Sequence, residues 1–97
     1  MNSKINIEIH ILNTDKKTLF DRDFQINAEL KIVDMLEILF NQYDLDAEKL
    51  RHLYIFLPIN EDPISLSSDD CAKSLTDYNA GNGTIIRIIY EGDTING

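Results

Sequence analysis

The stretch that most constrains the fold lies near the C-terminal end, residues 74–90, S-L-T-D-Y-N-A-G-N-G-T-I-I-R-I-I-Y. It contains a compact turn followed by the most strongly β-forming run in the sequence, Thr84 to Tyr90. A run this apolar is typical of a strand in the middle of a sheet, with another layer covering one face. We therefore expect the earlier segments to pack against this strand.

The first 26 residues predict an antiparallel hairpin. Isoleucines alternate with polar residues from Ile5 to Ile11, and a second alternating run extends from Thr18 to Ile26 after a short polar link. Arg22 falls on the same face as two phenylalanines. Either a bulge turns it away from that face, or its aliphatic stem lies on the core and its guanidinium reaches water.

The spacing of apolar residues then becomes helical and predicts an amphipathic helix with Asn27 as its N-cap. The residues that carry the pattern are Ile32, Met35, Leu36, Leu39 and Tyr43. Beyond the helix, the sequence predicts a helical turn at 47–50, a strand at 53–57 and a loop at 59–72 with a short edge strand at 64–66. This order predicts an α+β fold, a mixed four- to five-stranded sheet with one main helix packed on one face.

Length and charge limit the classes of function. Ninety-seven residues fit one domain, which we place at residues 1–90 with a tail at 91–97. The formal charge of −8 repels phosphate backbones, so we expect no nucleic-acid partner. A basic protein partner suits the charge better, although the same charge also serves simply to keep a small domain in solution.

We expect a cytoplasmic protein without a membrane partner. The N-terminus lacks the apolar stretch of a signal peptide, and the longest unbroken apolar run, Leu53 to Leu57, cannot span a bilayer. Cys71 is the only cysteine, which excludes an intrachain disulfide and suits a reducing compartment.

No catalytic or metal-binding constellation is evident, so we expect neither an enzyme nor a cofactor. Cys71 has several aspartates near it in sequence, which would disfavour a thiolate nucleophile. His10 and His52 have no partner at metal-ligand spacing.

The segment Leu75-Thr76-Asp77-Tyr78-Asn79, followed by a glycine-rich turn and Ile86 to Ile89, resembles the C-terminal third of ubiquitin. The spacing from Ile26 to Leu45 also fits ubiquitin without gaps. The resemblance implies the ubiquitin-like β-grasp fold. Three features depart from ubiquitin. The segment between Phe56 and Asp77 is longer, the acceptor lysines of ubiquitin have no clear counterparts, and the tail E-G-D-T-I-N-G lacks basic residues and paired terminal glycines.

The resemblance also implies a function, that of a ubiquitin-like protein modifier. Gly97 would be the conjugation residue, activated by an E1-like enzyme, and Asn96, Ile95 and Thr94 would form the extended tail that enzymes bind. The implied partners are E1-like and E2-like enzymes, a target protein and a deconjugating protease. The alternative is a non-conjugated interaction module or adaptor with the same fold.

A surface patch is the second implied site. If Ile86 and Ile88 point into the core, Arg87 and Ile89 point outward. Either Leu53 or Ile55 would then lie beside Ile89 on the neighbouring strand. We predict a protein-interaction patch formed by Ile55, Arg87 and Ile89, because the matching surface of ubiquitin is its main docking site.

Overall fold

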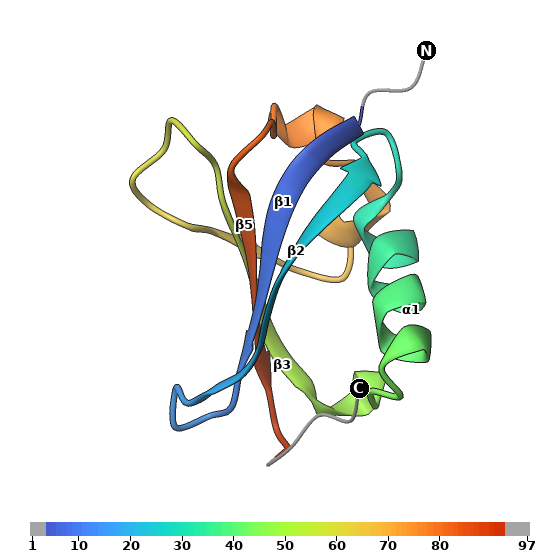
Figure 1. Ribbon diagram of the computed structural model, residues 1–97, viewed down its shortest axis with the longest axis vertical. Coiled ribbons are helices and arrows are strands. Elements are labelled where there is room, and N and C mark those ends of the chain that lie inside the picture. The colour runs from blue at the N-terminus through green and yellow to red at the C-terminus, as the bar shows by residue number, and fades with distance from the viewer. Residues whose placement is uncertain (1–3, 93–97) are drawn as a thin grey trace.

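Five strands form one mixed sheet, and a single α-helix packs on one of its faces (Figure 1). This arrangement confirms the predicted α+β class. The computed structural model describes residues 4–92. The elements are β1 (Lys4–Leu12), β2 (Thr18–Asn27), α1 (Ile32–Gln42), β3 (Leu50–Phe56), β4 (Ile64–Leu66) and β5 (Thr84–Tyr90), with short 3₁₀ turns η1 (Ala47–Lys49), η2 (Asp70–Ala72) and η3 (Thr76–Tyr78).

The last strand, β5, occupies the centre of the sheet, whose order is β2-β1-β5-β3-β4. It runs parallel to β1 and antiparallel to β3. Its side chains alternate strictly, so that Thr84, Ile86, Ile88 and Tyr90 are buried while Ile85, Arg87 and Ile89 are half-buried on the other face. The central position explains why the run is so apolar. One face of β5 lies under α1, and both of its edges pair with neighbouring strands.

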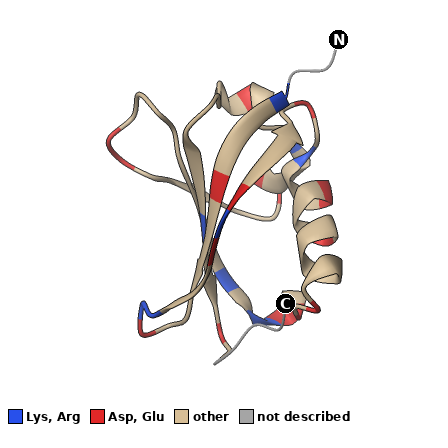
Figure 2. Cartoon of the chain, viewed as in Figure 1, with Lys and Arg blue, Asp and Glu red and all other residues tan. Residues whose placement is uncertain are grey.

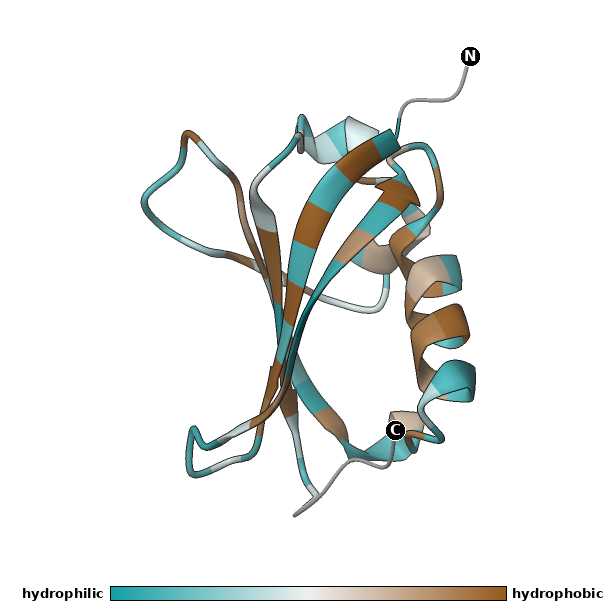
Figure 3. Ribbon diagram, in the orientation of Figure 1, coloured by the Kyte–Doolittle hydropathy of each residue, from teal (hydrophilic) through white to brown (hydrophobic). Residues whose placement is uncertain are grey.

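The hairpin of β1 and β2 shows the alternation that predicted it, as hydropathy bands along both strands (Figure 3). Its turn is held by Asn13, whose side-chain oxygen accepts hydrogen bonds from the backbone N–H groups of Asp15 and Lys17 at 2.9 and 2.8 Å. A side-chain amide that satisfies backbone donors in this way stabilises a tight turn.

Arg22 takes the second of its two predicted arrangements. The register of β1 and β2 is unbroken at Arg22, and the irregularity lies instead between Ile11 and Leu12. The Arg22 guanidinium lies 5.2 and 5.4 Å from the ring centres of Phe20 and Tyr43, and it donates a hydrogen bond to the Tyr43 hydroxyl at 3.3 Å. Arg22 is exposed, and the contact of its guanidinium with these rings lets the charge be tolerated at the edge of the core.

The helix begins at Ile32, so the prediction that Asn27 is its N-cap is wrong. Strand β2 continues through Asn27, whose side chain accepts a hydrogen bond from the Glu29 N–H at 2.9 Å and forms a turn. The helix has no side-chain cap; instead the Ile32 N–H donates to the Lys73 carbonyl at 3.0 Å. A distant segment therefore satisfies one of the donors that a helix start leaves free.

The residues that resemble ubiquitin close the core at the end opposite the hairpin turn. Leu75 is completely buried, and the next N–H, of Thr76, donates to the Ala28 carbonyl at 2.9 Å. The Asp77 carboxylate accepts from the Ser74 N–H at 2.9 Å, and the Tyr78 hydroxyl donates to the Asp70 carbonyl at 3.2 Å. These local bonds hold the turn together, and the bond from Thr76 to Ala28 ties it to the segment that leads into the helix.

The alternation along β5 gives a direct test of its register. We expect Ile88→Ala to lower the free energy of unfolding by about 2–5 kcal/mol, because it empties a fully buried site. The neighbouring Ile89→Ala should cost only about 1 kcal/mol, because Ile89 is half-buried. Urea unfolding followed by circular dichroism measures both values. Equal losses at the two positions would contradict the assigned faces.

Candidate functional site

The sheet face opposite α1 carries a shallow depression of about 390 Å³, centred on β5 and β3. We call it the outer depression. Strand β5 contributes Arg87 and Ile89, and the hairpin of β1 and β2 contributes Leu12 and the loop residues that follow it. In the register of the sheet, Ile89 lies between Leu12 of β1 and His52 of β3. The depression is also lined by Tyr54, Phe56 and Pro63.

Ile55 does not belong to this surface, which corrects the predicted patch. Ile55 is fully buried on the helix face and pairs with Ile86, and Leu53 is also buried. Tyr54 lies opposite Arg87 instead. Arg87 and Ile89 do take the outward face, as expected. The run L-Y-I-F-L concealed the outward residues Tyr54 and Phe56, because a continuous apolar run does not reveal which alternate residues face the core.

Arg87 is the most distinctive group in the outer depression. Its guanidinium carbon lies 4.8 Å from the centre of the Phe56 ring, a cation–π arrangement. Its Nε atom is buried without a hydrogen-bond partner. Within residues 4–92, no carboxylate forms a salt bridge with Arg87. A buried donor without a partner is costly, so this group favours the arrival of an acceptor.

The charge of the depression differs from that of the whole chain. Its lining residues include Arg87 and Lys16 and no Asp or Glu. Acidic side chains lie beside it on the β2 side, where Asp21 Oδ1 is 3.2 Å from His10 Nε2. His10 pairs with Asp21 across β1 and β2 and contacts that aspartate. The outer depression is a locally basic and aromatic surface on an acidic molecule.

The other predicted sites contribute no chemistry within the described residues. Gly97, Asn96, Ile95 and Thr94 lie outside the described residues. Between residues 4 and 92, no group of three or more His, Cys, Asp or Glu side chains could hold a metal ion. No helix in this range is long and apolar enough to cross a membrane.

Cys71 is buried, and this burial, with a contribution from Asp70, raises the pKa of its thiol. Asp70 is the first residue of η2. The Asp70 carboxylate accepts hydrogen bonds from the backbone N–H and the hydroxyl of Ser67, both at 2.9 Å. The Ser67 backbone bond, and then the hydroxyl bond, hold the pKa of Asp70 below its usual value. Neither group is set up as a nucleophile or general base at neutral pH.

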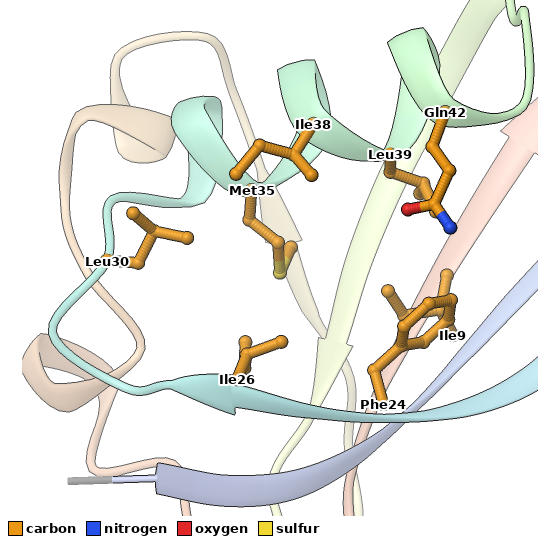
Figure 4. A pocket seen from close by; sticks show the side chains of 8 residues that line it. All are labelled: Ile9, Phe24, Ile26, Leu30, Met35, Ile38, Leu39 and Gln42. Carbon is orange, nitrogen blue, oxygen red and sulfur yellow. The ribbon is translucent and has the colours of Figure 1, made fainter. Parts of the chain in front are cut away.

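A second hollow lies between β2 and α1, lined by Phe24, Ile26, Met35 and Ile38 (Figure 4). Its volume is about 70 Å³. Sites for small molecules usually enclose roughly 300–1,000 Å³, so this hollow is too small for a ligand of that class. It is a gap in the side-chain packing at the edge of the core.

Comparisons with known proteins identify the fold. No protein-family model matches the sequence, and no curated protein matches it. Among solved structures, the C-terminal ubiquitin-like domain of mouse tubulin-specific chaperone e has a TM-score of 0.65 at 15% identity, over 97% of this chain and 95% of that one. The ubiquitin-like domain of tubulin-binding cofactor B has a TM-score of 0.58 at 17% identity, over 90% of this chain and 91% of that one. This chain has the ubiquitin-like β-grasp fold.

A protein designed on the basis of ubiquitin is also similar, with a TM-score of 0.50 at 22% identity, over 91% of this chain and 92% of that one. At these identities the comparisons establish the ubiquitin-like fold alone. The function of the chain has to be argued from its own surfaces.

The burial of Cys71 predicts a slow reaction with thiol reagents. We expect the native protein to react with an aromatic disulfide reagent at pH 8 at least tenfold more slowly than the urea-unfolded chain, because the folded state disfavours the thiolate. The rate is followed by absorbance. Because the folded pKa is raised, native reactivity should grow only as the pH rises above the ordinary thiol range. Fast reaction of the native protein at pH 8 would show that Cys71 is exposed or activated.

Proposed function

We propose that this protein is a protein-interaction module whose outer depression binds an acidic segment of a partner that also carries apolar side chains. The observation that carries the proposal is Arg87, which lies in a mostly apolar depression with its Nε unsatisfied and no carboxylate paired to it. A carboxylate from a partner would satisfy that donor in a charge-assisted hydrogen bond.

The aromatic side chains around Arg87 support a peptide or protein ligand. Tyr54 and His52 form a stacked pair with ring centres 6.0 Å apart, and Phe56 lies under the guanidinium. Tyr, Phe and Arg are the residues enriched at protein interfaces, because they combine a large apolar area with polar ends. Burial of Ile89 and these rings would supply affinity, and Arg87 would supply the preference for an acidic partner.

The similar structures agree with a binding role. Two of them are described as ubiquitin-like domains, one of a tubulin-specific chaperone and one of a tubulin-binding cofactor. By analogy we propose that this chain has no catalytic activity of its own and requires no cofactor. We further propose that it works in the cytoplasm, where its single thiol would stay reduced.

The second candidate function is that of a protein modifier. Its support is the ubiquitin-like fold, and it would require a free carboxylate at Gly97, because an activating enzyme needs a carboxylate without a side chain next to it. In that case E1-like and E2-like enzymes, a target and a deconjugating protease would be the partners. The tail lacks the basic residues and paired glycines of ubiquitin, so we rank this candidate below the interaction module.

The binding role of the outer depression is tested with a charge reversal. The protein is used as bait to capture partners from an extract of the cells that make it. Arg87→Glu should lower the recovery of those partners about tenfold, which corresponds to a loss of about 1.4 kcal/mol in binding free energy. Lys31→Glu, which makes the same charge change at an exposed position before α1, should have little effect. Quantitative mass spectrometry gives both ratios. Equal losses with the two variants would show that net charge, and not the depression, governs binding.

Deletion of Gly97 separates the two candidate functions. For an interaction module, the captured proteins should be unchanged by the deletion and lost with Ile89→Asp. For a modifier, ATP and an E1-like enzyme from the same cells should produce a Gly97 adenylate or thioester, detected by intact mass, and conjugates should vanish with the deletion. If Gly97-dependent conjugates form, the primary function is that of a modifier and not that of an interaction module.

A further inference from the structure

A second apolar surface lies on the helix side of the sheet, away from the outer depression. Two hollows of about 310 and 240 Å³ run along α1 and share Val33, Leu36 and Leu50. One extends to Phe40 and Leu45 and the other to Leu66. We call this continuous surface, defined by Val33, Leu36, Phe40, Leu45, Leu50 and Leu66, the helix groove.

The helix groove is open and almost entirely apolar. Val33 is 47% exposed although it is a large apolar side chain. Glu37 is the one charged residue among those that line the two hollows. A contiguous apolar surface of this kind, rimmed by polar residues, is a typical feature of interaction sites.

The rim of the helix groove is strongly acidic. The lining residues and their immediate neighbours in the chain include seven acidic residues and two basic ones, Lys49 and Arg51. The Nε of Arg51 already donates to the Glu91 carboxylate at 2.5 Å, and among residues 4–92 Lys49 is the cation of this set that forms no salt bridge. Figure 2 shows acidic bands on α1 and in the turn after it. The acidic residues are Asp34, Glu37, Asp44, Asp46, Glu48, Asp69 and Asp70.

This charge decides between occupants. A second copy of the chain would bring two acidic rims together, and like charges at an interface cost free energy. The chain's own tail, E-G-D-T-I-N-G, is acidic as well. A segment with lysine or arginine beside its apolar side chains would instead be attracted by the rim and would bury its apolar residues in the groove.

We propose that the helix groove is a second docking site, and that it binds a protein segment in which large apolar side chains stand next to Lys or Arg. Its charge preference is opposite to that of the outer depression. The two sites lie on opposite faces of the sheet, so both can be occupied at once. The module would then join a basic segment on one side to an acidic segment on the other.

The test uses a display library of random 16-residue segments, selected on the full chain with Val33→Lys as the counter-selection. The control is Ile38→Lys. Ile38 is 57% exposed on the same helix, lies five residues further along and lines the small hollow beside β2 instead of the groove. Both variants add one positive charge and remove one exposed apolar side chain. We expect the enriched segments to be apolar with net positive charge.

Their affinity should fall at least tenfold with Val33→Lys and change less than about twofold with Ile38→Lys or Arg87→Glu. Amide shifts on binding should centre on residues 33–37 and 50. Three results would overturn the proposal: no segment enriched against Val33→Lys, enriched segments without excess Lys and Arg, or equal losses with both helix variants. A wild-type dimer that Val33→Lys dissociates would instead assign the groove to a second copy. Because Arg87→Glu acts on the other face, failure here is distinguishable from failure of the outer depression.

Discussion

The position of β5 between β1 and β3 depends on a small set of polar contacts at the turn that precedes it. The Asn82 side-chain oxygen accepts a hydrogen bond from the Asn6 N–H at 2.8 Å, and the Gly83 N–H donates to the Asn6 carbonyl at 2.9 Å. Thr84, the one polar residue buried in this strand, donates its hydroxyl proton to the Gly81 carbonyl at 2.8 Å and accepts from the Gly81 N–H.

These bonds fix where β5 starts relative to β1, and a shift of one residue would have large consequences. It would exchange the buried Ile86 and Ile88 for Arg87 and Ile89, and it would place a charge under the helix. Gly83 has φ of 93°, a conformation that residues with a side chain rarely adopt, so the turn and the register are specified together. This register therefore decides which side chains of β5 lie on each face of the sheet.

Sequence reasoning was sufficient for the fold because the decisive signals were local. The period-two alternation of β1 and β2, the helical spacing of α1 and the turn chemistry of residues 74–79 each correspond to an observed element. It failed where a long-range contact replaced a local one. Asn27 is a good capping residue, yet the first N–H of the helix, that of Ile32, donates to the carbonyl of Lys73, more than forty positions away. Pairing of this kind leaves no trace in the residues near the helix.

The candidate site was predicted only in part, for a related reason. Arg87 and Ile89 were assigned correctly from the alternation of β5, whose ends are marked by polar residues. The sequence is apolar at five consecutive positions, Leu53 to Leu57, four of which belong to β3, so the alternation of this strand became visible only from the pairing of Tyr54 with Arg87. The total charge was equally uninformative about the site, because an acidic chain can place its few cations on one face. Here Arg87 and Lys16 line the outer depression, and no carboxylate is among its lining residues.

Strand β3 connects the two surfaces physically. Leu53 lines one of the two hollows of the helix groove, while its neighbours His52 and Tyr54 line the outer depression. Successive side chains of a strand point to opposite faces, so one strand can build two surfaces of unlike chemistry within a few residues. Each surface can then change by substitution without altering the other, because the backbone pairing that holds β3 to β5 does not depend on which outward side chains it carries. This independence is the physical basis on which one small ubiquitin-like domain could hold two different segments at once.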